Sequence, residues 1–160
     1  MRLRSNLRAR RTASAFSRAR FSDADMEGVQ AEGIDLRGAD LSYTALMDAD
    51  LEGANLEGAN LTQAKLQETC LQSARMKNCN LSGAGMLEAN LQYTDLENAN
   101  LEGAQFNEDT LLNQTNLKGA NLVSAPGLSS NQLGQALTDK KTRFPDYLEE
   151  EMDNDFLLQF

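Results

Sequence analysis

Apolar residues recur at every fifth position along most of this chain. The series begins at Phe16, gains one extra residue near Gln114, and resumes at Leu117. Its members are Phe16, Phe21, Met26, Ala31, Leu36, Leu41, Leu46, Leu51, Leu56, Leu61, Leu66, Leu71, Met76, Leu81, Met86, Leu91, Leu96, Leu101, Phe106, Leu111, Leu117 and Leu122. Only Ala31 is weakly apolar, so a period of five dominates the pattern and indicates a repetitive architecture.

A five-residue period does not fit an α-helix. Each step would advance about 140° around a helix, so the large residues would cover the whole circumference and bury no stripe. A small residue instead stands two positions before each large one, as Ala54 does before Leu56. That is strand spacing, which places both side chains on one face. The residue between them is often Asn or Asp and the next two suit a turn, so each unit predicts a short extended edge and a corner.

The stretch ANLEGANL at residues 54–61 resembles the pentapeptide-repeat family. The resemblance covers residues 14–125 and implies an all-β fold: a right-handed, four-sided parallel β-helix solenoid of about five coils, with four units in each coil. The charges support this coil independently, because a step of 20 brings together residues of alternating sign: Arg37, Glu57, Lys77, Glu97 and, after the extra residue, Lys118.

Residues 1–13 are expected to form a basic N-terminal arm or cap. Residues 1–22 hold seven Arg and no acid, whereas the whole chain carries a net charge of -9. We expect a cytoplasmic protein; import into a plastid or thylakoid is the alternative if residues 1–20 are a transit peptide, because Arg- and Ser-rich, acid-free heads are typical of these. No apolar run approaches the length of a membrane span, so membrane insertion is not expected.

Residues 126–160 predict a C-terminal helical cap with an acidic and hydrophobic tail. The repeat breaks at Pro126-Gly127, and Ser129 or Ser130 can cap a short helix that carries Leu133 and Leu137 on one side. The tail ends in apolar residues that either cover the last coil or join a second subunit in a homodimer: Phe156, Leu157, Leu158 and Phe160. The resemblance makes the homodimer a real alternative, because family members sometimes dimerise by their C-terminal ends.

The sequence offers no catalytic chemistry. Without His, neither a Ser-His-Asp nor a Cys-His arrangement can form. Carboxylates are spread over the whole surface, so no pair stands out as acid and base. In the repeat frame Cys70 falls at an outward position and Cys79 at an inward one, so they should neither pair nor share a metal. We therefore predict no enzyme, no catalytic residue, no metal and no cofactor.

One row of residues suggests a binding surface. On a single side of the expected coil, the step of 20 stacks four acids: Asp48, Glu68, Glu88 and Glu108. Like charges about 5 Å apart repel one another by roughly 1 kcal/mol in water. Met47 and Leu87 project beside the row. The row is either a solvated face or a docking site for a basic surface on a partner.

Two hypotheses of function follow. The first is a non-catalytic scaffold that binds another protein through a rigid acidic rod, as solenoids generally do. The second comes from the resemblance, since some family members are DNA mimics that bind and inhibit DNA gyrase, a type II topoisomerase. The uninterrupted repeats and the alternating charge ladder disfavour the second. Nucleic acid is not an expected ligand of the acidic body, although the Arg-rich N-terminal arm could bind it.

Overall fold

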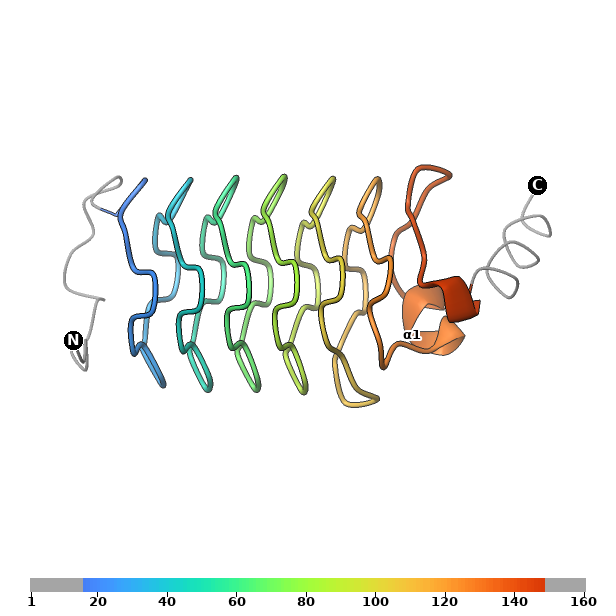
Figure 1. The fold of residues 1–160 in the computed structure, drawn as a ribbon, viewed down its shortest axis with the longest axis horizontal. Helices are drawn as coiled ribbons and strands as arrows, with labels where there is room; N and C mark the ends of the chain where they lie inside the picture. Colours follow the sequence, from blue (N-terminus) through green and yellow to red (C-terminus); the bar gives the residue numbers. More distant parts are fainter. Residues whose placement is uncertain (1–15, 149–160) are drawn as a thin grey trace.

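The computed structural model describes residues 16–148. The chain winds into a rod of stacked coils that ends in helix α1 (Ser130–Gly134), followed by the short 3-10 helix η2 (Asp146–Leu148) (Figure 1). Successive coils are joined by parallel bridges between residues 20 apart, such as Asp40 to Asn60 and Asn60 to Asn80. Because a unit has five residues, this spacing places four units in one coil and gives the rod four sides.

Each unit closes with a tight turn. The N–H of Ala59 donates to the carbonyl oxygen of Leu56 across 2.9 Å, and the same bond recurs along the rod. In every described five-residue unit the second residue after the large one has a positive φ, as required at the third position of a type II turn. Gly fills this place at Gly58, where φ is 66°, but Glu68 adopts a φ of 58° and Tyr43 one of 58°. The corners therefore hold side chains in the left-handed region, at roughly 1–2 kcal/mol each.

The Asn or Asp of the repeat has a local structural role. The side chain of Asn60 accepts a hydrogen bond from the N–H of Thr62 across 3.2 Å. The same side chain-to-backbone bond occurs at every described Asn or Asp in that position: residues 25, 35, 40, 50, 55, 60, 80, 90, 95, 100, 116 and 121. Such bonds are typical of Asx turns, so the polar position satisfies a backbone donor that no ladder bond reaches.

The interior is a column of large and small side chains. Leu66 is fully buried, and its N–H donates to the carbonyl oxygen of Gly85 in the next coil across 2.7 Å. Where Thr replaces Ala at the small position its hydroxyl is buried but not orphaned, since Thr69 donates to the Leu46 carbonyl across 2.7 Å. Each coil thus buries its apolar residues against its neighbours, and stability depends on stacking.

The extra residue lies earlier than the sequence pattern suggested. The bridge of Asn90 is to Leu111 rather than to residue 110, so the unit with six residues is 106–111 and not the one near Gln114. Leu112, 3% exposed, takes the interior place that we assigned to Leu111, which is 42% exposed. The assignment was wrong because Leu111 and Leu112 are adjacent and equally apolar, so either could be aligned with the interior position of the repeat. The longer turn is closed by the Thr110 N–H, which donates to the Asn107 carbonyl across 3.2 Å, and the Asn107 side chain accepts the Glu88 N–H of the preceding coil across 2.9 Å.

Helix α1 begins with a capping box. The Ser129 hydroxyl accepts the N–H of Gln132, and the Gln132 side chain accepts the Ser129 N–H. Leu133 is buried, but Leu137 lies beyond the helix and is 42% exposed, so the expected pairing of these two on one helical side was wrong. Leu137 instead forms a parallel bridge to Asn116, which continues one side of the rod past the helix.

Segments at both ends fall outside the described residues. These are most of the predicted transit segment 1–20, the arm 1–13 and the tail residues proposed for capping or dimer contacts: Phe156, Leu157, Leu158 and Phe160. Their assigned roles stay predictions. Within the described part, Phe16 and Phe21 pack against the core at the start of the rod, with ring centroids 6.0 Å apart.

Candidate partner-binding surface

Two opposite sides of the rod differ sharply in charge. The bridge register stacks residues 35–38, 55–58, 75–78, 95–98 and 116–119 on one side, here called the paired side. It stacks residues 25–28, 45–48, 65–68, 85–88 and 105–109 on another, here called the acidic side. The two sides are two units apart in a coil of four, so they face in opposite directions.

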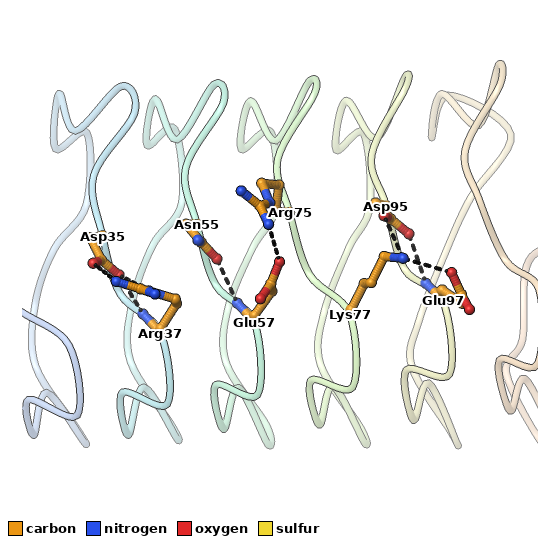
Figure 2. Close-up of polar contacts among 8 residues, drawn as sticks. All are labelled: Asp35, Arg37, Asn55, Glu57, Arg75, Lys77, Asp95 and Glu97. Carbon is orange, nitrogen blue, oxygen red and sulfur yellow. Dashed lines mark hydrogen bonds and ion pairs between the residues drawn. The ribbon is translucent and has the colours of Figure 1, made fainter. Parts of the chain in front are cut away.

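The paired side carries equal numbers of acids and bases. They are Asp35, Glu57, Asp95 and Glu97 against Arg37, Arg75, Lys77 and Lys118. Most of them contact each other directly (Figure 2). The nitrogen–oxygen distances are 2.7 Å from Arg37 to Asp35, 2.7 Å from Arg75 to Glu57, 2.8 Å from Lys77 to Glu97 and 3.4 Å from Lys77 to Asp95. This side is therefore close to electrically neutral.

The predicted charge ladder is in register, although its partners differ in part. The N–H of Gly58 donates to the Lys77 carbonyl and that of Asn78 to the Glu97 carbonyl, so the ladder residues do occupy adjacent coils. Lys77 pairs with Glu97 as expected. Arg37, however, pairs with Asp35 in its own unit, and Glu57 pairs with Arg75. Long side chains on this flat side can reach a nearer acid of the neighbouring column.

These contacts change the pKa values of charged side chains on the paired side. The hydrogen bond from Arg37 lowers the pKa of Asp35, and the hydrogen bond from Lys77 lowers the pKa of Glu97. The same bond raises the pKa of Lys77. Each carboxylate pairing therefore stabilises the folded state above the unfolded carboxyl pKa and is lost as the pH falls through the lowered folded value. All three side chains are solvent-accessible, so the contribution is small and screened by salt.

The acidic side has seven acids and one base. The acids are Asp25, Glu27, Asp48, Glu68, Glu88, Glu108 and Asp109, and the base is Lys65. Three of the four acids in the predicted row are stacked in adjacent coils. The N–H of Asp48 donates to the Gln67 carbonyl across 3.1 Å, and that of Glu68 donates to the Leu87 carbonyl across 3.0 Å.

The fourth acid of the row does not continue the stack. Glu88 donates its N–H to the side chain of Asn107, not to a backbone carbonyl, because the six-residue unit begins there. Glu108 lies exposed in the longer turn next to Asp109. The prediction of four stacked acids is therefore corrected to three, with two more acids on the following coil. An alignment of the repeats with the extra residue in 106–111 would have predicted that Glu108 leaves the row.

The corner geometry holds the stacked acids outward. Asp48, Glu68 and Glu88 have φ values of 57°, 58° and 59°, and all three are exposed. Among residues 16–148 no ion pair links any of them to a base. Met47 and Leu87 lie half-buried one position before two of these acids, as expected. The row thus presents unpaired carboxylates beside apolar contacts.

Two further groupings were not found from the sequence. Donor atoms of Asp50, Glu52 and Cys70 lie within 4.8 Å of one another on the side that follows the acidic side. The signal was the 20-residue step from 50 to 70. At the N-terminal end of the paired side a hollow of about 470 Å³ is lined by Ser17, Arg18, Arg37, Gly38 and Glu57, with charges of both signs.

The two cysteines occupy the predicted places. Cys70 is half-buried on the outer surface and Cys79 is buried in the interior. Burial raises the pKa of the Cys79 thiol to about 12. Among the described residues both thiols are free, and no helix is long and apolar enough to cross a membrane.

The profile of the pentapeptide repeats matches eight copies in this chain, over residues 14–51, 44–83 and 86–122. The chain belongs to the pentapeptide-repeat family, whose fold is a right-handed quadrilateral β-helix and whose members are generally non-catalytic structural or binding proteins. No match was found among the curated proteins.

Solved structures of the same family are similar to this chain. The pentapeptide-repeat protein Rfr23 from the cyanobacterium Cyanothece 51142 is 27% identical, with a TM-score of 0.55 over 75% of this chain and 90% of that one. HetL, involved in heterocyst differentiation regulation in the cyanobacterium Nostoc sp. PCC 7120, is 29% identical, with a TM-score of 0.43 over 76% and 60%. QnrB1, a plasmid-mediated fluoroquinolone resistance protein, is 16% identical, with a TM-score of 0.46 over 86% and 70%.

Proposed function

We propose that this protein is a non-catalytic interaction scaffold whose acidic side binds a basic surface of another protein. The observation that carries the proposal is the segregation of charge: seven acids and one base on the acidic side, against four acids and four bases on the paired side. A solvated face needs no such arrangement. A docking face benefits from it, because charge complementarity speeds encounter and selects the partner.

The stacked row is already organised for binding. Bridges between coils fix the spacing of Asp48, Glu68 and Glu88 at about 4.8 Å. Carboxylates held at this backbone spacing would repel by about 1 kcal/mol in water and by more when water is displaced. A partner that places Arg or Lys between them relieves this repulsion and gains hydrogen bonds to both rungs. The backbone is already ordered by the stacking of coils, so the ordering that opposes binding is mainly that of the exposed side chains.

The partner surface should combine cations with apolar groups. Met47 and Leu87 lie beside the row, with Gln67 in the coil between them. A purely electrostatic contact would be lost in moderate salt, because exposed charges are screened over about 8 Å at physiological ionic strength. Apolar contact with Met47 and Leu87 adds area that salt does not screen.

The experiment compares matched charge reversals on purified components. Glu68→Lys/Glu88→Lys changes the acidic side, and Glu57→Lys/Glu102→Lys changes the net charge equally on other sides. A protein captured by the unaltered chain is purified, and its affinity for the three forms is measured at two salt concentrations. We expect a loss of at least about tenfold for the first variant alone. Equal affinities for all three folded forms would contradict the proposal.

DNA gyrase is a specific candidate partner that the same variants can test. Titration into a supercoiling assay should give inhibition at low micromolar levels if the rod mimics DNA, and Glu68→Lys/Glu88→Lys should relieve it. The neutral paired side disfavours this mode, because duplex DNA is negative around its whole circumference. Absence of inhibition at any soluble concentration would remove gyrase and leave the scaffold with a different basic partner.

A further inference from the structure

We propose that the Arg-rich residues 1–15 dock on the acidic side of their own chain and compete there with the basic partner. The competition rests on the proposed function, whereas the docking itself does not. Residues 1–15 lie outside the described part of the chain, so we argue from their sequence and from the position of Phe16, to which they connect.

The charges of the two regions are complementary. Residues 1–15 contain five Arg and no acid: Arg2, Arg4, Arg8, Arg10 and Arg11. The acidic side carries seven acids against Lys65 as its one base. The paired side offers no comparable attraction, because its described acids contact bases of their own at 2.7 to 3.4 Å. On the acidic side no ion pair among the described residues engages Asp48, Glu68 or Glu88, so the position of these three carboxylates selects that side.

The point of attachment allows the arm to reach this surface. Phe16 lies in the first coil, where the Arg18 N–H donates to the Arg37 carbonyl at the end of the paired side. Crossing one end of the coil takes about 17 Å, the length of five extended residues. Passing from the coil of Asp25 to that of Glu88 takes three steps of about 4.8 Å, or roughly 15 Å. Fifteen residues can span up to about 50 Å, so the whole row is within reach.

Tethering makes even weak docking effective. A segment attached by a short flexible linker experiences an effective concentration in the millimolar range. An arm occupying the surface nine-tenths of the time would weaken the apparent affinity for a competing partner about tenfold. The arm would thereby exclude weakly basic surfaces and admit a partner with a stronger combination of charge and apolar contact.

Energy transfer between two dyes tests the docking without any partner. One dye is placed on the N-terminal amine of the full chain and the other on Cys70, two positions after Glu68. Cys79 is buried and its pKa is about 12, so it should stay unlabelled in the folded protein. We expect high transfer at low ionic strength and a progressive fall between about 0.05 and 1 M salt, as screening shortens the range of attraction.

The matched variants locate the docking site. Glu68→Lys/Glu88→Lys should reduce the transfer at low salt to its high-salt level, whereas Glu57→Lys/Glu102→Lys should leave it near the unaltered value. Transfer that is independent of salt, or lowered equally by both variants, would overturn the inference. If the first variant does not fold, the salt titration of the unaltered chain still tests the docking, because the transfer from an undocked arm stays nearly constant as salt is added.

A peptide of residues 1–15 tests the competition. It is titrated into the unaltered chain and into an arm-neutralised chain carrying Arg2→Gln, Arg4→Gln, Arg8→Gln, Arg10→Gln and Arg11→Gln. Removing the tethered competitor should strengthen binding of the peptide about tenfold. Equal affinity for both chains would show that the arm does not occupy the surface. A partner could still bind there, so this result would leave the proposed function standing.

Discussion

Replacing Gln132 by Leu should loosen the C-terminal end of the rod. Gln132 is buried, and its side chain makes four hydrogen bonds. Its amide nitrogen donates to the carbonyl oxygens of Asn107 and Thr110, each across 2.9 Å. Its oxygen accepts from the N–H and hydroxyl of Ser129, across 3.0 and 2.9 Å. This one side chain therefore ties helix α1 to the six-residue unit beneath it.

The magnitude follows from the groups left without partners. The Thr110 carbonyl is the buried one of the two acceptors, and an unsatisfied buried acceptor costs about 1–3 kcal/mol. Loss of the reciprocal capping bond adds about 1 kcal/mol. The more apolar Leu side chain offsets part of this by burial. We expect Gln132→Leu to lower the free energy of unfolding by about 2–3 kcal/mol.

Urea unfolding measures this loss. With a slope of about 2 kcal/mol per molar, the midpoint should fall by about 1–1.5 M. Amide hydrogen exchange should increase first near Leu111 and Leu117, because unfolding in a stacked repeat protein can begin at a weakened end. Asn131→Leu, at an exposed position of the same helix, is the matched control and should change little. A loss below about 0.5 kcal/mol for Gln132→Leu would refute the assigned role.

Three other predictions concern the repeat and the thiols. Leu112→Ala should cost about 2–5 kcal/mol in chemical unfolding, while Leu111→Ala should cost less than about 0.5, and the reverse order would contradict the six-residue unit. Gly127→Ala should lower stability by more than about 1 kcal/mol, because φ is 86° and a Cβ there would collide with the carbonyl of Phe106; calorimetry checks this. An aromatic disulfide reagent at pH 8 should titrate Cys70 alone, with Cys79 reacting only in denaturant, since burial raises its pKa to about 12.

The repeat itself could be predicted because the five-residue motif recurs in many copies along the chain. The spacing of large and small residues indicated the extended edge. The family resemblance implied the 20-residue coil, and the ladder from Arg37 to Lys118 supported it. The insertion was misplaced because Leu111 and Leu112 fit the interior equally well by hydrophobicity. The bridge from Asn90 to Leu111, the burial of Leu112 and the hydrogen bond from Glu88 to the Asn107 side chain separate the two frames. The hydrophobic pattern alone contains none of these contacts.

The sequence predicted which acids lie on the candidate surface, but it predicted their stacking and contacts only in part. The row of Asp48, Glu68 and Glu88 follows from the coil length. The prediction that Glu108 continues this row was wrong, because the extra residue had been placed too late in the sequence. The contacts on the paired side depend on which rotamer a long side chain selects, as the Arg75 contact to Glu57 illustrates. The role of Gln132 had an available signal, because Ser129 followed by Gln three positions later is a capping-box pattern.

A calorimetric titration with matched charge variants tests whether the position of the acids, and not the net charge, creates the binding surface. The basic probe is the peptide of residues 1–15, and the recipients are the arm-neutralised chain and two variants of it. We expect binding at least about tenfold weaker for Glu68→Lys/Glu88→Lys. For Glu57→Lys/Glu102→Lys we expect a change of no more than about threefold. Equal weakening in both variants would show that net charge alone attracts the peptide and would contradict a binding surface set by the position of the acids.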